Sequence, residues 1–312
     1  MHKMRSRQDM FLISICVCTF KRPAGLAKCL ASLASMQLPG GCELEVVVVD
    51  NDSAASARPF VESLQTSYPL ALRYFCEQQS GVGFARNRCL AESAGAWIAF
   101  IDDDEWADPQ WLKELWSHLQ ASGVDGVFGP VLANFEVDPP AWLRQSGVYE
   151  RHRDPSGKRL SWKNCASGNV IFRKKLVDGV GGFCADFAAS GAEDAEFFWR
   201  CLQAGAVFEW CDSAIAQENI PPARMTRHYV LRRAYLGGHN YARLQAHQMG
   251  PSVYLNLFIR GSIVIVAFGF LALLARIAGN PRALFFETKV AGGWGKLKAA
   301  FSMPEREYGP GS

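Results

Sequence analysis

The stretch AWIAFIDDDE, residues 96–105, decides the fold of this chain. It begins as a run of β-branched and aromatic residues, which is typical of a strand buried on both faces, and it ends in four acids. Asp108 and Pro109 follow as a helix N-cap and a first-turn proline, so a helix is predicted directly after the acids. Because ligands of open α/β sheets bind at the carboxyl ends of strands, the acids are predicted to face a ligand.

The four acids crowd negative charge, which raises their pKa values unless a cation lies among them. Asp102 and Asp104 are two residues apart, so in extended chain their side chains lie on one side. A hard divalent ion such as Mg²⁺ or Mn²⁺ binds carboxylate oxygens and shares its remaining positions with a phosphate ligand. The alternative is a solvated acidic loop that caps the next helix, and the buried strand that leads into the acids weighs against it.

Strands and helices alternate before this stretch. Strands are predicted at 11–19, 44–49 and 70–76, and helices at 23–36, 59–65 and from about residue 84. With the strand at 96–101 and the helix predicted after the acids, strand and helix alternate four times, which indicates a parallel sheet with right-handed crossovers. Each strand ends in a polar cluster, and together these clusters predict a binding edge. Gly81 and Gly83 open a helix that carries Arg86, which suits a phosphate but fits a plain loop equally well, since the third glycine of a dinucleotide motif is absent.

Composition excludes several classes of protein. The 312 residues are 49% hydrophobic and 20% charged, with a net charge of +3, and no basic stretch is interleaved with aromatic residues, so no nucleic-acid partner is expected. The ten cysteines are scattered without CxxC spacing and are predicted to be reduced and mostly buried. Residues 1–20 resemble a secretory signal superficially, but no small-residue cleavage site follows, so 11–19 is predicted to be a first strand.

Past the acids, the pattern predicts strands at 124–131, 166–172 and 207–210 and a short helix near 139–143. The polar residues 147–162 are predicted to form a mobile loop over the site. The start of the strand at 166–172 is Ser-Gly-Asn, which suits a close approach of backbone to a ligand.

Four short motifs at the strand ends, in this order, resemble the family 2 glycosyltransferases, which share the GT-A fold. The motifs are TFKR at 19–22, VDNDS at 49–53, GVGFARN at 81–87 and IDDD at 101–104. The resemblance covers about residues 11–245. It implies an α/β fold with a mostly parallel nucleotide-binding sheet flanked by helices.

The resemblance also implies the roles of the strand-end residues. It implies that Thr19 and Asp50 hold the nucleoside of a nucleotide-diphosphate sugar. By the same resemblance Asp104, helped by Asp102, holds Mn²⁺ or Mg²⁺ on the diphosphate. The full predicted donor-binding set is Thr19, Phe20, Arg22, Asp50, Asn51, Gly81, Arg86, Asp102, Asp103, Arg232 and Arg233.

Glu193 and Asp194 begin a helix whose residues 197–202 form an apolar face. The helix dipole favours the ionised form of a carboxylate at this position, and a general base must be ionised. An isolated Glu-Asp pair is more often an ordinary acidic N-cap. In the family, however, such a pair supplies the catalytic base, and Asp194 is the matching position, with Glu193 the next candidate.

Two further predictions concern the phosphate side of the site. Many relatives carry a histidine near the position of Glu218, where it can complete the metal site. This sequence has a glutamate there, so Glu218 is a candidate for the third metal ligand, and the identity of that ligand stays open. Arg232 and Arg233 are candidates for neutralising the leaving diphosphate, with a basic solvated helix face as the equal alternative.

The C-terminal part of the chain changes character. Residues 253–277 are nearly all apolar, and 261–275 carry no charge. A spanning helix needs about 20 such residues, and the uncharged run is slightly shorter than that. An interfacial or re-entrant helix therefore competes with a spanning helix, and a helix of the soluble core is a third alternative. Residues 289–298 resemble a second, basic amphipathic segment. Under the positive-inside rule this flank indicates the cytoplasmic face of the inner membrane.

We therefore expect an inverting, metal-dependent glycosyltransferase that moves a sugar from a nucleotide-sugar donor to a glycan acceptor, one linked to a lipid, in polysaccharide or glycoconjugate synthesis. The expected domains are a GT-A domain at 1–245, with a donor half at 11–130 and an acceptor half at 131–245, and a membrane-associating tail at 246–312.

Two other classes compete with this reading. A nucleotidyltransferase of related fold would require a glycine-rich, basic loop after the first strand, and TFKRP at 19–23 contains no glycine. A non-catalytic module that binds nucleotide sugar or serves as a scaffold would not need the acids at both 102–104 and 193–194.

Overall fold

Alternating side chains of the first strand build two apolar cores. The computed structural model describes residues 11–151, 153–188 and 191–301, so the basic residues 1–7 and the end of the tail lie outside the described residues. In β1 (Phe11–Thr19), Ile13, Ile15 and Val17 belong to one core, and Cys16 belongs to the other. This period of two places one core on each face of the sheet.

The predicted alternation of strands and helices is confirmed. The strands are β1, β2 (Cys42–Asp50), β3 (Ala71–Cys76), β4 (Trp97–Ile101), β5 (Glu105–Ala107), β6 (Gly126–Phe128), β7 (Val131–Phe135), β8 (Asn169–Arg173), β9 (Phe208–Trp210) and β10 (Ala216–Ile220). The helices are α1 (Pro23–Ser35), α2 (Arg58–Leu64), α3 (Val82–Glu92), α4 (Trp111–Ser122), α5 (Ala141–Ser146), α6 (Lys175–Val180), α7 (Glu193–Gln203), α8 (Arg227–Met249), α9 (Val253–Ile277) and α10 (Ala283–Ala299). Short 3₁₀ turns lie at Trp162–Asn164, Ala185–Phe187 and Pro222–Arg224.

The main sheet has seven strands in the order β3–β2–β1–β4–β8–β6–β9. Strand β1 pairs in parallel with β2 and with β4, while β8 is antiparallel to both β4 and β6. The sheet is therefore mostly parallel, as predicted. Because β1, β2 and β4 are parallel and adjacent, their carboxyl ends meet at one edge, where the predicted site residues follow.

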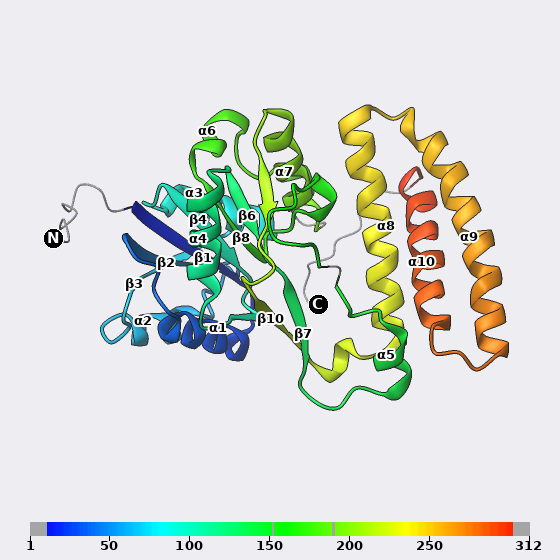
Figure 1. The fold of residues 1–312 in the computed structure, drawn as a ribbon, viewed down its shortest axis with the longest axis horizontal. Coiled ribbons are helices and arrows are strands. Elements are labelled where there is room, and N and C mark those ends of the chain that lie inside the picture. The colour runs from blue at the N-terminus through cyan, green and yellow to red at the C-terminus, as the bar shows by residue number, and fades with distance from the viewer. Residues whose placement is uncertain (1–10, 152, 189–190, 302–312) are drawn as a thin grey trace. The chain divides into compact units, whose positions relative to one another are not determined.

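Helices cover both faces of this sheet (Figure 1). Residues of α1, α2 and α4 share one core with β1 and β2, and residues of α3 and α7 share the other. The second core is rich in aromatic rings: Phe128 and Phe198 stand edge to face with centroids 4.9 Å apart, an arrangement that adds to the stabilisation from area alone. All ten cysteines are free, as predicted.

Two local predictions were wrong, one strand was not predicted, and part of one predicted loop is packed on the sheet. The helix after the acids begins at Trp111 and not at Pro109, because Glu105–Ala107 first forms β5 and pairs with β10. The predicted strand at 124–131 is two strands, β6 and β7, separated by Gly129 and Pro130, since proline cannot donate to a ladder. Strand β10 itself was not predicted, since its polar residues Gln217, Glu218 and Asn219 hide the strand pattern. Residues 159–160 of the predicted loop are also held down: Arg159 bridges Glu209, and Leu160 is buried.

The chain divides into two compact units. Unit 1 comprises 1–132, 152–189 and 193–218, and unit 2 comprises 133–151, 190–192 and 219–312. Within unit 2, α10 lies between α8 and α9 (Figure 1). A Cβ at Gly238 of α8 would overlap the carbonyl oxygen of Gly292 in α10, so glycine is what permits this close approach.

Helix α9 coincides with the predicted apolar segment. It is 25 residues long, and its most apolar window has a mean hydropathy of 2.4 with only 17% of its residues buried. Of the helices in the described ranges, it is the one long and apolar enough to cross a membrane. A core helix of this composition would be mostly buried, so α9 is an exposed apolar helix.

Candidate active site

Asp103 is the buried member of the acid run. Its carboxylate accepts a hydrogen bond from Thr19 Oγ1 at 2.8 Å and pairs with the Arg22 guanidinium at 3.0 Å. Burial raises the pKa of Asp103 to about 6; the charge of Asp104 acts in the same direction, while Arg22 and Thr19 oppose it. Asp103 therefore ties the carboxyl end of β1 to that of β4, and Thr19 and Arg22 meet the acids as the sequence suggested.

Asp102 and Asp104 are more accessible. The Asp102 side chain is 39% exposed and pairs with Arg86 at 3.2 Å, and the Asp104 side chain is 18% exposed and pairs with Arg22 at 3.2 Å. Desolvation by the surrounding protein raises the pKa of Asp102, with further increases from the charges of Asp104 and Asp194 that Arg86 offsets in part. Since solvent reaches both carboxylates, a ligand can reach them too.

Arg86 connects the acid run to the start of α7. Its side chain is 6% exposed, and its guanidinium pairs with Asp102 and with the buried carboxylate of Glu193. Burial alone would lower the pKa of Arg86, but the charges of Glu193, Asp102 and Asp194 outweigh that effect and raise it. The arginine thus stays charged and holds together two acids from segments far apart in sequence.

Glu193 and Asp194 are adjacent but stand in different surroundings. Glu193 is 2% exposed and bound to Arg86, whereas Asp194 is only partly buried. One Asp194 oxygen accepts the Ser167 N–H at 3.2 Å, and the other accepts the Ala195 N–H at 2.7 Å. The Ala195 N–H belongs to the first turn of α7 and the Ser167 N–H to the segment before β8. These donors hold the Asp194 carboxylate in place where solvent reaches it, as the position of a general base requires.

Asp50, Asn51 and Gly81 organise the neighbouring strand end. Asp50 is fully buried, and its carboxylate accepts the N–H groups of Asp52 and Ala57 at 2.9 and 2.8 Å. The Asn51 amide donates to the Gln79 carbonyl at 2.7 Å and accepts the Gly81 N–H at 2.8 Å. These bonds fix the loop that opens α3, so Asn51 and Gly81 position Arg86.

Gly81 has a φ of +139° that only glycine adopts without strain, and a Cβ there would lie 2.8 Å from the Ala188 carbonyl oxygen. The glycine is therefore explained by packing within the protein.

The remaining predicted residues lie at the end of β1, in β10 or in the other unit. Phe20 is half-buried at the end of β1, with the Lys21 ammonium 5.2 Å from its ring centroid. Glu218 is buried in β10, opposite Glu105 of β5. Arg232 and Arg233 lie on α8 of unit 2, so their role at the diphosphate stays a prediction.

Two carboxylates of this edge fit a divalent cation. Asp102 and Asp104 are solvent-accessible oxygen donors. Desolvation is the main cause of the raised pKa of Asp102, and the charges of Asp104 and Asp194 add to it; a cation would relieve this added repulsion. Among the described residues, no three His, Cys, Asp or Glu side chains are gathered as a metal cluster. The predicted ligand set of Asp102, Asp104 and Glu218 is therefore not brought together as one group in the described part of the chain.

Two residues of the site were not among the predicted site residues. Ser167 donates to Asp194 from its backbone, and buried Glu105 accepts the Asp102 N–H at 3.2 Å. A Cβ at Gly168 would lie 2.6 Å from a Glu105 oxygen. The Ser-Gly pair before β8 signalled a close approach, and the structure shows that its partners are the protein's own acids.

The fold and this edge of acids define a class of protein. A mixed sheet with flanking helices, whose parallel strands end in an acidic nucleotide-binding edge, is the GT-A fold of nucleotide-sugar transferases. The solved mannosyltransferase PcManGT from Pyrobaculum calidifontis, in complex with GDP-Man and Mn²⁺, is similar with a TM-score of 0.65 at 17% identity, covering 94% of this chain and 88% of that one. Residues 1–349 of S. aureus TarS with UDP-GlcNAc match with a TM-score of 0.55 at 17% identity, covering 92% and 90%. At such identities the likeness shows the fold.

The sequence relatives show the family. The family model described as glycosyl transferase family 2 matches residues 14–181, and the N-terminal domain of galactosyltransferase matches 149–228. The succinoglycan biosynthesis protein ExoM of Rhizobium meliloti (strain 1021) is 32% identical over 237 residues, 76% of each chain. The hyaluronan synthase of Pasteurella multocida is 26% identical over 68% of this chain but only 25% of its own length. The chain belongs to the family 2 glycosyltransferases.

Proposed function

We propose that this protein is an inverting glycosyltransferase of bacterial exopolysaccharide synthesis, which moves a sugar from a nucleoside-diphosphate donor to a glycan acceptor. The observation that carries the proposal is the separation of two adjacent acids. Glu193 is buried against Arg86, while its neighbour Asp194 is accessible and held by backbone N–H groups. A site with one ionised, reachable carboxylate beside a second acidic cluster suits direct displacement at an anomeric carbon.

In this reaction Asp194 takes the proton of an acceptor hydroxyl. The hydroxyl oxygen attacks the anomeric carbon, and the bond from that carbon to the donor diphosphate breaks on the opposite face, so the configuration inverts. The nucleoside diphosphate departs with the bonding electrons. Thr19, Arg22 and Asp103 keep the end of β1 in place beside the donor, with Asn51 and Gly81 positioning α3.

We propose Asp104 and Asp102 as the ligands of a Mn²⁺ or Mg²⁺ ion, which when bound stabilises negative charge on the departing diphosphate. The third ligand stays open, because the described structure does not gather Glu218 with these two carboxylates. The solved relative with GDP-Man and Mn²⁺ supports use of a divalent metal in this fold. Arg232 and Arg233 are proposed to assist at the diphosphate from α8.

We propose further that the acceptor is linked to a lipid and that the enzyme works at the cytoplasmic face of the inner membrane. Support comes from α9, whose outward side chains are apolar: Leu255 is 71% exposed and Val266 is 73% exposed. A lipid-linked glycan presents its sugar close to the headgroups, so an enzyme anchored by such a helix meets it there.

Exchange of Asp194→Asn tests the proposal. The amide keeps the shape of the side chain but cannot take a proton, so transfer should fall by a factor on the order of 10² to 10⁴ while nucleotide affinity is unchanged. Transfer is measured with a panel of UDP- and GDP-sugars, and binding by calorimetry. NMR of the product shows whether the anomeric configuration inverts.

Asp212→Asn is the matched control, because Asp212 is an exposed carboxylate of unit 1 that pairs with Arg153 at 2.8 Å. It should leave transfer unchanged. Equal activity of the two variants would contradict the assignment of the base to Asp194.

A further inference from the structure

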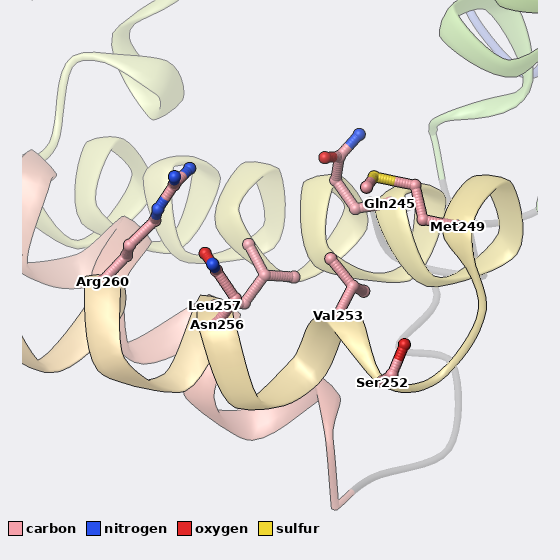
Figure 2. A pocket seen from close by; sticks show the side chains of 7 residues that line it. All are labelled: Gln245, Met249, Ser252, Val253, Asn256, Leu257 and Arg260. Carbon is pink, nitrogen blue, oxygen red and sulfur yellow. The ribbon is translucent and has the colours of Figure 1, made fainter.

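A small pocket lies at the end of unit 2 where α8 turns into α9 (Figure 2). Its volume is about 290 Å³. It is lined by Gln245, Met249, Ser252, Val253, Asn256, Leu257 and Arg260. Figure 2 shows the Leu257 side chain between those of Arg260 and Val253. The pocket therefore combines the apolar side chains of Met249, Val253 and Leu257 with amide, hydroxyl and guanidinium groups.

The lining has the donors that a phosphate ester requires. The Arg260 guanidinium offers a rigid fork of N–H donors that matches phosphate oxygens. The Asn256 amide and the Ser252 hydroxyl add neutral donors, and so does one N–H of the Gln245 amide, whose nitrogen also donates to Gln248 Oε1 at 2.9 Å. Among the described residues, no aspartate or glutamate lines the pocket. An anion is the ligand that this charge pattern favours.

The charge of the surrounding helices points the same way. Residues 227–301 contain ten Lys and Arg and a single acid, Glu287, whereas the rest of the chain contains 23 basic and 29 acidic residues. The one acid is already engaged, because the Glu287 side chain is 12% exposed and pairs with both Arg227 and Arg276. The helical segment thus has a formal charge of +9 with no free acid in its sequence to balance Arg260.

The position of Arg260 on α9 selects a lipid over a free anion. Arg260 lies in the second turn of α9, next to Phe258 and Ile259, which are 45% and 53% exposed. An arginine among exposed apolar side chains places its guanidinium at the level of lipid headgroups when the helix enters a bilayer. Leu257, which lines the pocket, packs with Ala242 of α8 and Ala299 of α10. These two helices therefore hold this wall of the pocket in place.

We propose that this pocket binds the phosphate headgroup of an anionic phospholipid, with Arg260 as its charged ligand and Asn256, Gln245 and Ser252 as supporting donors. The proposal rests on the membrane association proposed above and adds a site that selects among lipids. Such a site would fix the depth and rotation of α9 at the bilayer surface, which apolar side chains alone leave free.

Flotation of the full chain on vesicles tests the proposal. Two vesicle compositions are compared, phosphatidylcholine alone and phosphatidylcholine with phosphatidylglycerol, at low and high salt. The wild type should prefer the anionic vesicles, and Arg260→Gln should reduce that preference on the order of tenfold, the worth of one charge-assisted hydrogen bond. Arg260→Lys should restore only part of it, because the forked geometry is lost.

Arg282→Gln is the control, since Arg282 is an exposed arginine of the same unit that does not line the pocket. It removes the same charge and should cause a small, salt-sensitive loss only. Equal losses in Arg260→Gln and Arg282→Gln would overturn the pocket and leave general electrostatic attraction.

A competition experiment separates the lipid from a free anion. Soluble short-chain phosphatidylglycerol should displace the wild type from anionic vesicles, whereas inorganic phosphate at the same concentration should not. Displacement by inorganic phosphate would overturn a lipid site in favour of a simple anion site. Flotation on both vesicle types without a difference between them would overturn the pocket while leaving membrane association intact, and absence of flotation on either would overturn both.

Discussion

The carboxyl edge of the main sheet and the outward face of α9 depart from the usual distribution of polar and apolar groups in opposite directions. At the sheet edge, Asp103, Arg86 and Glu193 are charged and almost completely buried. On α9, Leu255, Val266 and other large apolar side chains face solvent. Buried charge is costly unless it is paired, and exposed apolar surface is costly unless it is covered.

The two regions resolve this cost differently. The sheet edge pairs its charges within unit 1, through Arg22 with Asp103 and Arg86 with Glu193. Asp102 and Asp104 pair with the same two arginines, but they and Asp194 are only partly buried, so a ligand can reach them. Helix α9 has no such internal solution, because α10 covers one of its faces and the opposite face stays apolar. The first region is preorganised for a small charged ligand, and the second is incomplete without a large apolar one.

The first prediction concerns a substitution that removes one charge of the buried pairs at the sheet edge. Glu193→Gln leaves the buried guanidinium of Arg86 with Asp102 as its remaining charged partner, and loss of one member of a buried pair typically costs about 3–5 kcal/mol in the free energy of unfolding. Urea denaturation measures this loss. The same exchange at Glu209, a partly exposed acid that pairs with His118 at 3.0 Å, should cost much less.

A second prediction removes the apolar face of α9. Leu255, Val266 and Leu273 are each more than half exposed and recur at helical spacing, so replacing all three by glutamine should weaken vesicle binding by a factor on the order of 10² or more. The helix pair with α10 should survive, because Gly261 and Leu257 form that side. Vesicle binding that persists in this triple variant would show that α9 is not the membrane anchor.

A third prediction tests the open acids for a cation. Asp104→Ala should abolish the part of nucleoside-diphosphate affinity that depends on Mn²⁺ or Mg²⁺, an effect of at least about tenfold for loss of a charged metal ligand. Chelation of the metal should have the same effect on the wild type and none on the variant. Calorimetry in which both proteins respond equally to the metal would contradict the assignment.

The smallest expected effect concerns a buried acid far from the ligand edge. Burial alone would raise the pKa of Glu45, but hydrogen bonds from Ser14, the Ala94 N–H and Arg73 lower it below the usual value. An acid with a depressed pKa in the folded state adds stability above its unfolded pKa of about 4.3, and that stability is lost as pH falls through the folded pKa.

Glu45→Gln should therefore lower the free energy of unfolding by about 1–2 kcal/mol at pH 7, and the difference from the wild type should vanish at acidic pH. Urea denaturation of both proteins across this range measures it. A difference that does not change with pH would show that Glu45 acts through packing alone.

The sequence by itself determined the first four strands, their alternation with helices, and the residue types at the end of each. Runs such as the valines at 46–49 and the span of α9 at 253–277 are set by local composition and periodicity, which need no tertiary information. The four motifs at the strand ends were enough to indicate the family. The acids at 102–104 could be recognised as a ligand edge because a buried strand leads directly into them.

Only the tertiary structure decided which acids are available. Arg86 and Glu193 are 107 residues apart. Nothing in either segment alone shows that the Arg86 guanidinium neutralises Glu193 and leaves Asp194 accessible to solvent. The antiparallel β8 and the pairing of β5 with β10 are likewise set by contacts between distant segments. Burial and pairing depend on which segments meet in space, and so the same two adjacent carboxylates, equivalent in sequence, acquire different chemistry in the fold.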